Sequence, residues 1–179
     1  MRLFIAITLP DDIKDILYNI QKEIGNEYVK VKWVARKNVH LTLKFLGDVD
    51  GSKVEIIKEA LRNVNHKKFK LSLGNLGWYP SKDKVNVIWV GLRPEKEVFH
   101  LHSEVELKLG SLFGNDSRFG VHMTLGRVKF VKYKEKFLDL LKKIKIRGED
   151  FEVNSFSLIK SDLSKDGPKY FVMEKYELQ

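Results

Sequence analysis

Two short stretches decide the architecture expected for this chain: His40-Leu41-Thr42-Leu43 and His122-Met123-Thr124-Leu125. Each has a Thr two positions after the His and a Leu three positions after it, and both lie in apolar, strand-like segments. With five His and three Thr in the chain, random placement would give only about 0.08 His-x-Thr triplets. The two motifs lie almost half the chain apart. This spacing predicts two similar lobes that each present one His and one Thr to a shared cleft.

Alternation along a strand indicates which side chains of each motif point to the same face. Side chains two residues apart point to the same face of a strand, so His40 and Thr42 share one face while Leu41 and Leu43 point to a core. The second motif repeats this arrangement. Hydroxyl groups can donate hydrogen bonds to phosphate oxygens, and two imidazoles can divide the work of general base and general acid. A single motif would more often be a polar surface, but the pair favours metal-free, in-line displacement at a phosphodiester.

The residues that follow the motifs are further candidates for binding a substrate. Lys44 shares the face of His40 and is predicted to line the cleft as a cation. Phe45 and Arg127 both stand five positions after a motif His. Alternation places Phe45 in the core, although its position also makes it a candidate substrate contact.

Arg127 has the parity of the apolar face, but an unpaired Arg should not enter a core. Gly126 can mark a bulge that turns Arg127 back to the cleft, where it would bind a phosphate or stack on a base. A place on the surface beyond the end of the strand is an equally open interpretation.

Composition restricts the partners and the chemistry. The formal net charge of +9 favours a polyanionic partner such as nucleic acid. Because the chain has no Cys, disulfides, thiol nucleophiles and thiolate metal sites are excluded. A zinc site needs a further protein ligand beside the two His, and Gly-rich phosphate loops are absent, so we expect neither a metal nor another cofactor. No apolar run is long enough to span a membrane, and a cytoplasmic location is expected.

The apolar periodicity predicts an α+β fold: two pseudo-symmetric lobes of mostly antiparallel sheet, with helices on the outside and a central cleft. No linker divides residues 1–179, so we expect one bilobal domain. A capping-box pattern at Ser52 predicts the start of the second helix. Strands are expected at residues 2–8, 31–35, 39–46, 69–74, 85–92, 121–128, 151–160 and 169–177, and helices at 10–24, 52–64, 94–109 and 134–143. The segments 75–84, 114–117 and 162–168 are expected to be turns or loops.

The remaining His and the large aromatic residues receive no catalytic role. His66 lies in a charged stretch, whereas His100 and His102 are two apart on a predicted helix and therefore face apart. The aromatic residues could stack on bases, but burial in the core or at the rim is commoner. These aromatic residues are Trp33, Trp78, Tyr79 and Trp89.

At these residues the chain resembles the 2H phosphoesterase superfamily and, within it, the RNA 2′,3′-cyclic phosphodiesterases, also called RNA 2′-5′ ligases. The resemblance covers essentially the whole chain and departs at Val121, where the family usually has Pro. It rests on the two motifs and on the order of the segments around them: residues 1–6, 31–34, 38–47, 87–91, 122–128 and 161–170.

The resemblance implies a bilobal fold with a basic cleft, and hydrolysis of a terminal 2′,3′-cyclic phosphate to a 2′-phosphate. It also implies a reversible, ATP-independent 2′-5′ ligation of RNA ends, with tRNA halves as one candidate substrate. By the same resemblance His122 is the general base and His40 the general acid, while Thr42 and Thr124 bind the non-bridging oxygens. Arg127 neutralises charge or stacks on the terminal base.

Two other functions stay open on the sequence alone. A non-catalytic module could use the cleft to hold RNA ends, and it would bind RNA in a salt-dependent way without turnover. A related phosphodiesterase could instead act on another small cyclic nucleotide. In each case the expected state is a monomer.

Overall fold

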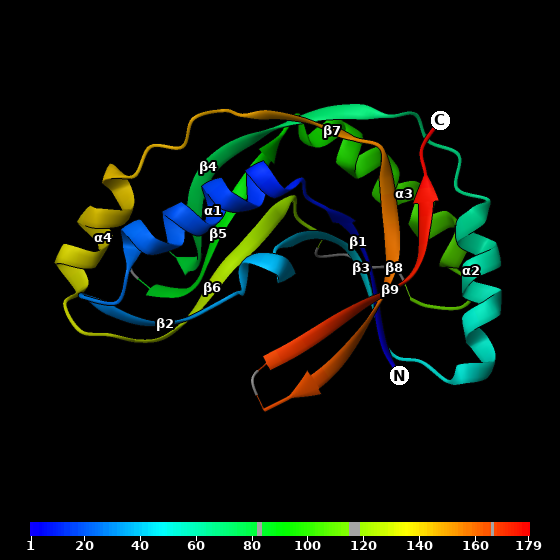
Figure 1. Cartoon of the computed structure of the whole chain (residues 1–179), viewed down its shortest axis with the longest axis horizontal. Coiled ribbons are helices and arrows are strands. Elements are labelled where there is room, and N and C mark those ends of the chain that lie inside the picture. The colour runs from blue at the N-terminus through cyan, green and yellow to red at the C-terminus, as the bar shows by residue number, and fades with distance from the viewer. Residues whose placement is uncertain (82–83, 115–118, 166) are drawn as a thin grey trace.

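The computed structural model describes residues 1–81, 84–114, 119–165 and 167–179. In these ranges the chain forms two antiparallel sheets flanked by helices (Figure 1). The strands are β1 (Arg2–Thr8), β2 (Val29–Trp33), β3 (His40–Asp48), β4 (Phe69–Ser81), β5 (Lys84–Arg93), β6 (His122–Val131), β7 (Asp150–Val153), β8 (Ser155–Ser164) and β9 (Gly167–Glu177). The helices are α1 (Asp11–Ile24), α2 (Val54–Arg62), α3 (Glu95–Leu109) and α4 (Lys134–Lys143), with short 3₁₀ turns η1 (Arg36–Asn38) and η2 (Gly51–Lys53).

The two motifs lie in different sheets, as their spacing predicted. The first motif begins β3, an edge strand of the four-stranded sheet with the order β3-β1-β8-β9. The second begins β6, which lies between β2 and β5 in the five-stranded sheet with the order β2-β6-β5-β4-β7. All neighbouring strands in the described pairings are antiparallel, and the predicted α+β class is confirmed.

The helices cover the outer side of the sheets, α1 and α4 beside the five-stranded sheet and α2 and α3 beside the four-stranded one (Figure 1). α1 contacts β6 and α3 contacts β3, so each motif strand has a helix behind it. Apolar residues at helical spacing explain this packing, because they form one buried stripe on each helix. The stripe is Ile13, Leu17, Ile20 and Ile24 on α1, and Val98, Leu101, Val105 and Leu109 on α3.

Both motif strands contain a β-bulge at the same place. The pairing of β3 with β1 skips Leu43, and the pairing of β6 with β5 skips Leu125. Each skipped residue stands three positions after its motif His. Because a bulge inserts one unpaired residue, side chains beyond it alternate in the opposite phase. Residues five positions after each His therefore return to the face that carries the His.

The capping-box prediction at Ser52 is wrong. The carboxylate of Asp50 accepts hydrogen bonds from the backbone N–H of Ser52 at 2.8 Å and from its hydroxyl at 2.6 Å. The chain then forms η2, and α2 begins only at Val54, without a side-chain cap. An ionised carboxylate is the stronger acceptor at a helix start, so Asp50 takes the position expected for Ser52.

The predicted connections at 75–84 and 162–168 are also mostly wrong. β4 continues through Ser81, and β8 and β9 extend to Ser164 and Gly167. Cross-strand pairing overrides the turn-forming residues there. Residues 82–83 and 166, and most of the predicted loop at 114–117, lie outside the described residues.

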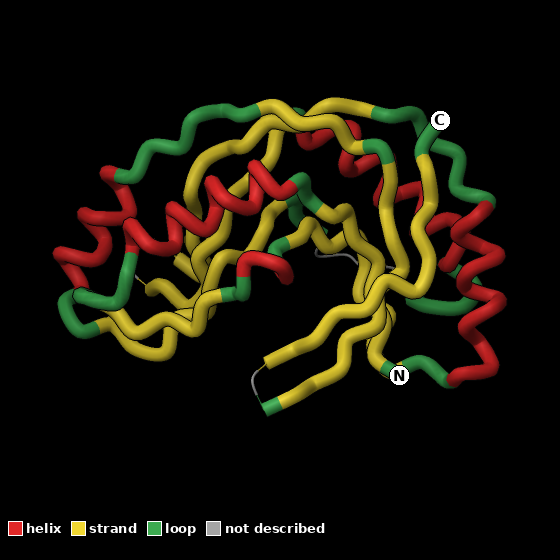
Figure 2. Tube along the Cα trace, in the orientation of Figure 1, coloured by secondary structure: helices red, strands yellow, loops and turns green. Residues whose placement is uncertain are grey.

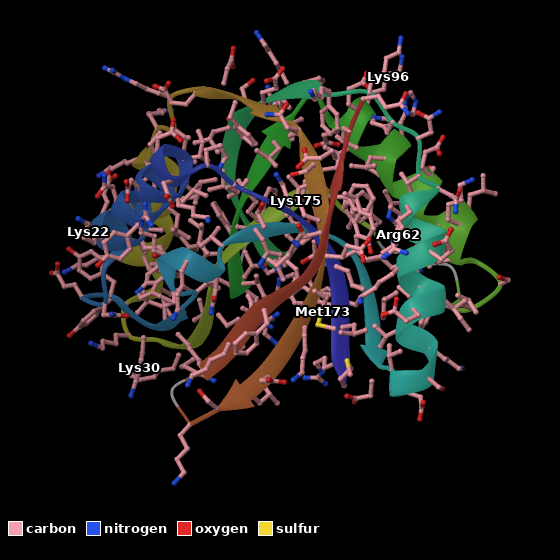
Figure 3. All side chains as sticks on the ribbon, turned by 45° about the vertical axis from the view of Figure 1, so that its right-hand side comes forward. Lys22, Lys30, Arg62, Lys96, Met173 and Lys175 are labelled. Atoms are coloured by element: carbon pink, nitrogen blue, oxygen red, sulfur yellow. The ribbon has the colours of Figure 1, made fainter. Side chains whose placement is uncertain are left out.

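The β8–β9 hairpin extends beyond its sheet toward η1 (Figure 2). The side-chain amide of Asn38 in η1 donates to the carbonyl of Pro168 in β9 at 2.9 Å. At the other end of the hairpin, Arg62 on α2 donates to both carboxylate oxygens of Glu174 at 2.7 and 2.9 Å (Figure 3). The hairpin is therefore held at both ends.

Basic side chains are spread over the outside of the molecule, and Lys30 and Lys96 extend away from it (Figure 3). Such solvated charges contribute to the net charge without marking a site. Among the described helices, none combines the length and the apolar character that crossing a membrane requires.

Gly126 follows the second bulge and allows β2 to approach β6 closely. A Cβ at this position would lie 2.5 Å from Cγ1 of Val31 and 2.7 Å from the ring of Trp33. Such distances require the side chains of Val31 and Trp33 to shift. We expect Gly126→Ala to lower the free energy of unfolding by about 1–3 kcal/mol through overpacking.

The matched control is Gly51→Ala, because a Cβ at Gly51 meets nothing within 4 Å. Urea unfolding of both variants measures the difference. An equal loss of stability in the two variants would contradict close packing of β2 on the second bulge.

Candidate active site

A cavity of about 600 Å³ is lined by residues of both motif strands and of the β8–β9 hairpin. The structure brings together there all the residues that the sequence singled out. These are His40, Thr42, Lys44, Phe45, His122, Thr124 and Arg127. Convergence of two strands from separate sheets thus places two imidazoles and two hydroxyls on the walls of one cavity.

The imidazole of His40 is fixed by hydrogen bonds on both ring nitrogens. Nδ1 lies 2.7 Å from the carbonyl oxygen of Asn38, and Nε2 lies 2.9 Å from Oγ1 of Thr42. A carbonyl can only accept, so Nδ1 donates and the neutral ring carries its proton there. Nε2 then accepts from the Thr42 hydroxyl. Nε2 is therefore the atom that can take up and release a proton.

Aromatic rings enclose each motif His. The ring of Tyr170 meets His40 edge-on at 5.4 Å between centroids, and Phe4 lies 4.9 Å away. His122 has a matching pair, with Tyr79 edge-on at 5.4 Å and Trp89 at 5.9 Å. Each motif His thus contacts two aromatic rings, although the rings come from different register positions in the two sheets.

Burial behind these rings lowers the pKa of both imidazoles, because low polarity disfavours the charged form. The hydrogen bond to the Asn38 carbonyl opposes this effect at His40 and favours its protonated form. At His122 the backbone of Gly120 opposes it. Among the described residues, Nδ1 of His122 has no hydrogen-bond partner of good geometry, so the two imidazoles differ in how firmly they are oriented.

The second bulge turns Arg127 to the cavity, where its side chain is exposed. The sequence left two interpretations of Arg127 open: a bulge at Gly126 that turns it to the cleft, or a place on the surface beyond the end of the strand. The structure has the bulge. Arg127 lies close enough to the β8–β9 hairpin that its positive charge opposes the rise in the pKa of Tyr170 caused by burial. Arg127 and Tyr170 both line the cavity.

Simple alternation, which places Phe45 in the core, is wrong, and the structure has Phe45 where a substrate contact would lie. Its side chain is 70% exposed and lines the cavity. The bulge at Leu43 reverses the alternation, so Phe45 returns to the face of His40 and lies 6.2 Å from the ring of Phe4. Lys44, not a glycine, comes directly after Leu43. The sequence therefore lacks here the kind of signal that Gly126 gave for the second bulge.

The same bulge corrects the prediction for Lys44. The side chain is 2% exposed, and its ammonium is bound by the carboxylate of Glu106 at 2.5 Å and by the carbonyl of Gly114 at 2.8 Å. Lys44 borders the cavity, but its charge is paired and buried. It does not offer the free cation that simple alternation predicted.

The sequence did not identify the residues that surround the imidazoles. Phe4 and Tyr170 carry no periodic signal, because they reach His40 through pairing between strands distant in the sequence. Asn38 lies only two residues before His40, but it acts through its backbone carbonyl, which no residue type reveals. Tyr79 and Trp89 were assigned to the core or the rim. The structure places them at the rim, Tyr79 exposed and Trp89 half-buried, with both rings in contact with His122.

The cavity is basic. Apart from the paired Lys44, its described lining includes Arg2, Lys32, Lys37, Arg127 and Lys169, and no Asp or Glu. This charge suits a phosphate-bearing ligand. In the described ranges no group of three or more His, Cys, Asp or Glu is arranged to hold a metal ion.

Comparison with known proteins gives matches to both halves of the chain. The sequence model of the family described as LigT-like phosphoesterase matches residues 7–89 and again residues 90–170. The RNA 2′,3′-cyclic phosphodiesterase of Methanocaldococcus jannaschii is 34% identical over 179 residues, covering 98% of this chain and 100% of that protein.

Solved structures share the architecture. The crystal structure of the Thermus thermophilus protein TT0787 superposes with a TM-score of 0.81 at 26% identity, covering 99% of this chain and 97% of that one. Escherichia coli LigT in its apo form gives a TM-score of 0.78 at 25% identity, again covering 99% and 97% of the two chains. The similarity extends over the whole length of these proteins.

The lowered pKa values of His40 and His122 predict their titration in the free protein. Both imidazoles should become protonated below about pH 6.5, the reference value for His, because burial favours the neutral ring. Above that pH both imidazoles are neutral and their burial does not reduce the free energy of unfolding. As the pH falls, the unfolded chain binds protons at these His more readily than the folded protein, so the free energy of unfolding decreases. Two-dimensional NMR of the ring nitrogens, assigned with His40→Gln and His122→Gln, measures both midpoints. A midpoint at or above the reference value for either residue would contradict the effect of burial.

Proposed function

The chain belongs to the LigT-like phosphoesterase family and is an enzyme, and on this premise we propose that it hydrolyses a terminal 2′,3′-cyclic phosphate of RNA to a 2′-phosphate. One observation carries the proposal: two imidazoles and two threonines from separate sheets line a single basic cavity. The relative from M. jannaschii, which carries the name RNA 2′,3′-cyclic phosphodiesterase, supports the choice of substrate.

The reaction needs one proton accepted and one proton donated. His122 takes a proton from the attacking water, whose oxygen bonds to phosphorus while the bond from phosphorus to O3′ breaks. His40 gives a proton to the departing O3′, which leaves a 2′-phosphate and a free 3′-hydroxyl. This assignment follows the family resemblance. The hydrogen bond from Nδ1 of His40 to the Asn38 carbonyl supports it by fixing the ring with Nε2 free to carry the transferred proton, and it partly offsets the larger lowering of the pKa by burial.

The phosphate is held by the remaining polar groups of the cavity. Thr42 and Thr124 donate to the non-bridging oxygens, and the guanidinium of Arg127 neutralises the charge that develops on them or stacks on the terminal base. Phe45, exposed on the same wall as His40, offers a stacking surface for a base. Lys44 has a structural role instead, because Glu106 and the Gly114 carbonyl occupy its ammonium.

The same geometry accommodates ligation. A 5′-hydroxyl that replaces the attacking water would form a 2′-5′ linkage, and the strained cyclic phosphate would supply the driving force without ATP. Both reactions run without a metal or another cofactor in this proposal. The RNA partner carries a 2′,3′-cyclic phosphate end, with tRNA halves as one candidate, and residues 1–179 act as one bilobal domain in a monomer.

The test is turnover of a short RNA that ends in a 2′,3′-cyclic phosphate, incubated with the protein in excess EDTA. The wild type should produce a 2′-phosphate. His40→Ala and His122→Ala should each lower kcat by at least about 10²-fold, the usual contribution of one general acid or base. Sensitivity of the product to phosphatase and to a 3′-specific enzyme identifies the position of the phosphate.

His100→Ala is the matched control, because His100 lies on the exposed side of α3, away from the cavity. It should retain the activity of the wild type. Binding of the RNA without turnover by the wild type would favour a non-catalytic end-binding module. Turnover of small cyclic nucleotides alone would favour a different substrate, and either result would contradict the proposal.

A further inference from the structure

The backbone carbonyls at the two bulges are held by side chains from the helices behind them. The carbonyl of Leu43 is bound by His102 on α3, and the carbonyl of Leu125 is bound by Gln21 on α1. Each of these side chains is at least nine-tenths buried, within a helix stripe that is otherwise apolar. A buried polar group is unfavourable unless its hydrogen bonds are made, so both positions call for an explanation.

Gln21 uses both protons of its amide group. Its Nε2 donates to the carbonyl of Leu125 at 2.9 Å and to the carbonyl of Val34 at 2.8 Å. The backbone N–H of Val34 also donates to the carbonyl of Leu125 at 2.8 Å. One side chain thus ties the extra residue of β6 to the segment that follows β2.

His102 has the corresponding place behind β3. Its Nδ1 lies 3.0 Å from the carbonyl oxygen of Leu43, and because a carbonyl only accepts, Nδ1 donates. The ring stacks on Phe119 with centroids 3.9 Å apart and planes 6° apart. Phe119 itself lines the cavity. His102 is therefore fixed between the bulge and the cavity wall.

The two contacts are equivalent in the two halves of the molecule. α1 follows a strand of the four-stranded sheet but contacts β6, and α3 follows a strand of the five-stranded sheet but contacts β3. Each helix supplies one donor to the residue three positions after a motif His. The donor to the bulge carbonyl is the amide of Gln21 in one half and the imidazole of His102 in the other.

We propose that Gln21 and His102 are positioning residues that hold the two bulges, and through them keep Arg127 and Phe45 facing the bound RNA end. This inference rests on the proposed function. Strand register supports it, because a strand that re-pairs without its bulge moves every later side chain to the other face. Arg127 and Phe45 stand beyond the bulges and depend on them, whereas the motif His stand before them.

A double-mutant cycle tests the connection between Gln21 and Arg127. Gln21→Met keeps the length of the side chain but removes its donors, and it should lower kcat/KM for the cyclic-phosphate RNA about tenfold, mainly through KM. In the Arg127→Ala background the same substitution should change kcat/KM by less than about twofold, because the residue it positions is absent.

Leu17→Ala is the matched control on α1. Leu17 is fully buried, one turn before Gln21 on the same stripe, and its truncation lowers stability without removing a hydrogen bond to a bulge carbonyl. At a temperature where all variants are folded, as circular dichroism shows, its kcat and KM should equal those of the wild type. A purely structural role for Gln21 would make Gln21→Met behave in the same way.

His102 provides a second cycle, which stands even if Gln21→Met does not fold. His102→Phe removes the donor and keeps an aromatic ring beside Phe119, and it should raise KM in the wild type but not in the Phe45→Ala background. His102→Asn, which places an amide N–H near the position of Nδ1, should restore much of the loss.

An equal fold-loss in both backgrounds, or no loss in either, would overturn the positioning role. If the wild type shows no turnover, the proposed function fails first. A crystal structure of Gln21→Met then decides the inference separately: Arg127 displaced from the cavity supports it, and an unchanged bulge with Arg127 in place overturns it.

Discussion

The structure depends on one local constraint, the extra residue that each motif strand carries three positions after its His. Without the bulges at Leu43 and Leu125, alternation would place Phe45 and Arg127 on the far side of their strands. With them, each strand presents its His, its Thr and a third side chain to the same cavity. Within six consecutive residues, each motif strand thus supplies three side chains to the cavity while its other face stays in the core. The same bulge makes this possible in both lobes.

Enclosure of the imidazoles has a clear electrostatic consequence. Aromatic neighbours shield His40 and His122 from water and lower the pKa of both rings. In the proposed reaction a phosphate anion enters between them and favours the protonated form of the nearer ring. Binding of the substrate and protonation of the general acid are then coupled, while the basic lining attracts the anion to the cavity.

Much of this organisation could be predicted from the sequence, because it follows from local patterns. The two motifs, the parity of His and Thr, and the bounds of α1, α3 and α4 all depend on residues close together in the chain. The second bulge had a local sign in Gly126. The first had none, because Lys44 occupies the corresponding position and is stabilised by Glu106, a residue of a distant helix.

Contacts between distant segments account for the remaining errors and omissions. The long hairpins and the aromatic residues around each imidazole are set by strand pairing and tertiary packing. The cap by Asp50 is the exception, because it is a local contact in which a carboxylate two residues before Ser52 takes the capping position. His102 was assigned no role because its partner, the carbonyl of Leu43, becomes available only when β3 bulges against α3. A hydrogen bond to a backbone carbonyl cannot be predicted from residue type or spacing, because every residue has such a carbonyl.

In the proposed reaction two imidazoles on equivalent strands carry out two proton transfers, one as general base and the other as general acid. The pH dependence of kcat/KM, which reports the groups of the free enzyme, tests it most directly. Because burial lowers both pKa values, the two-imidazole mechanism predicts a bell-shaped profile with its maximum below about pH 6.5. The residual activity of His40→Ala should lack one limb of the bell and that of His122→Ala the other. A flat profile from about pH 5 to 9, or loss of the same limb in both variants, would contradict this mechanism.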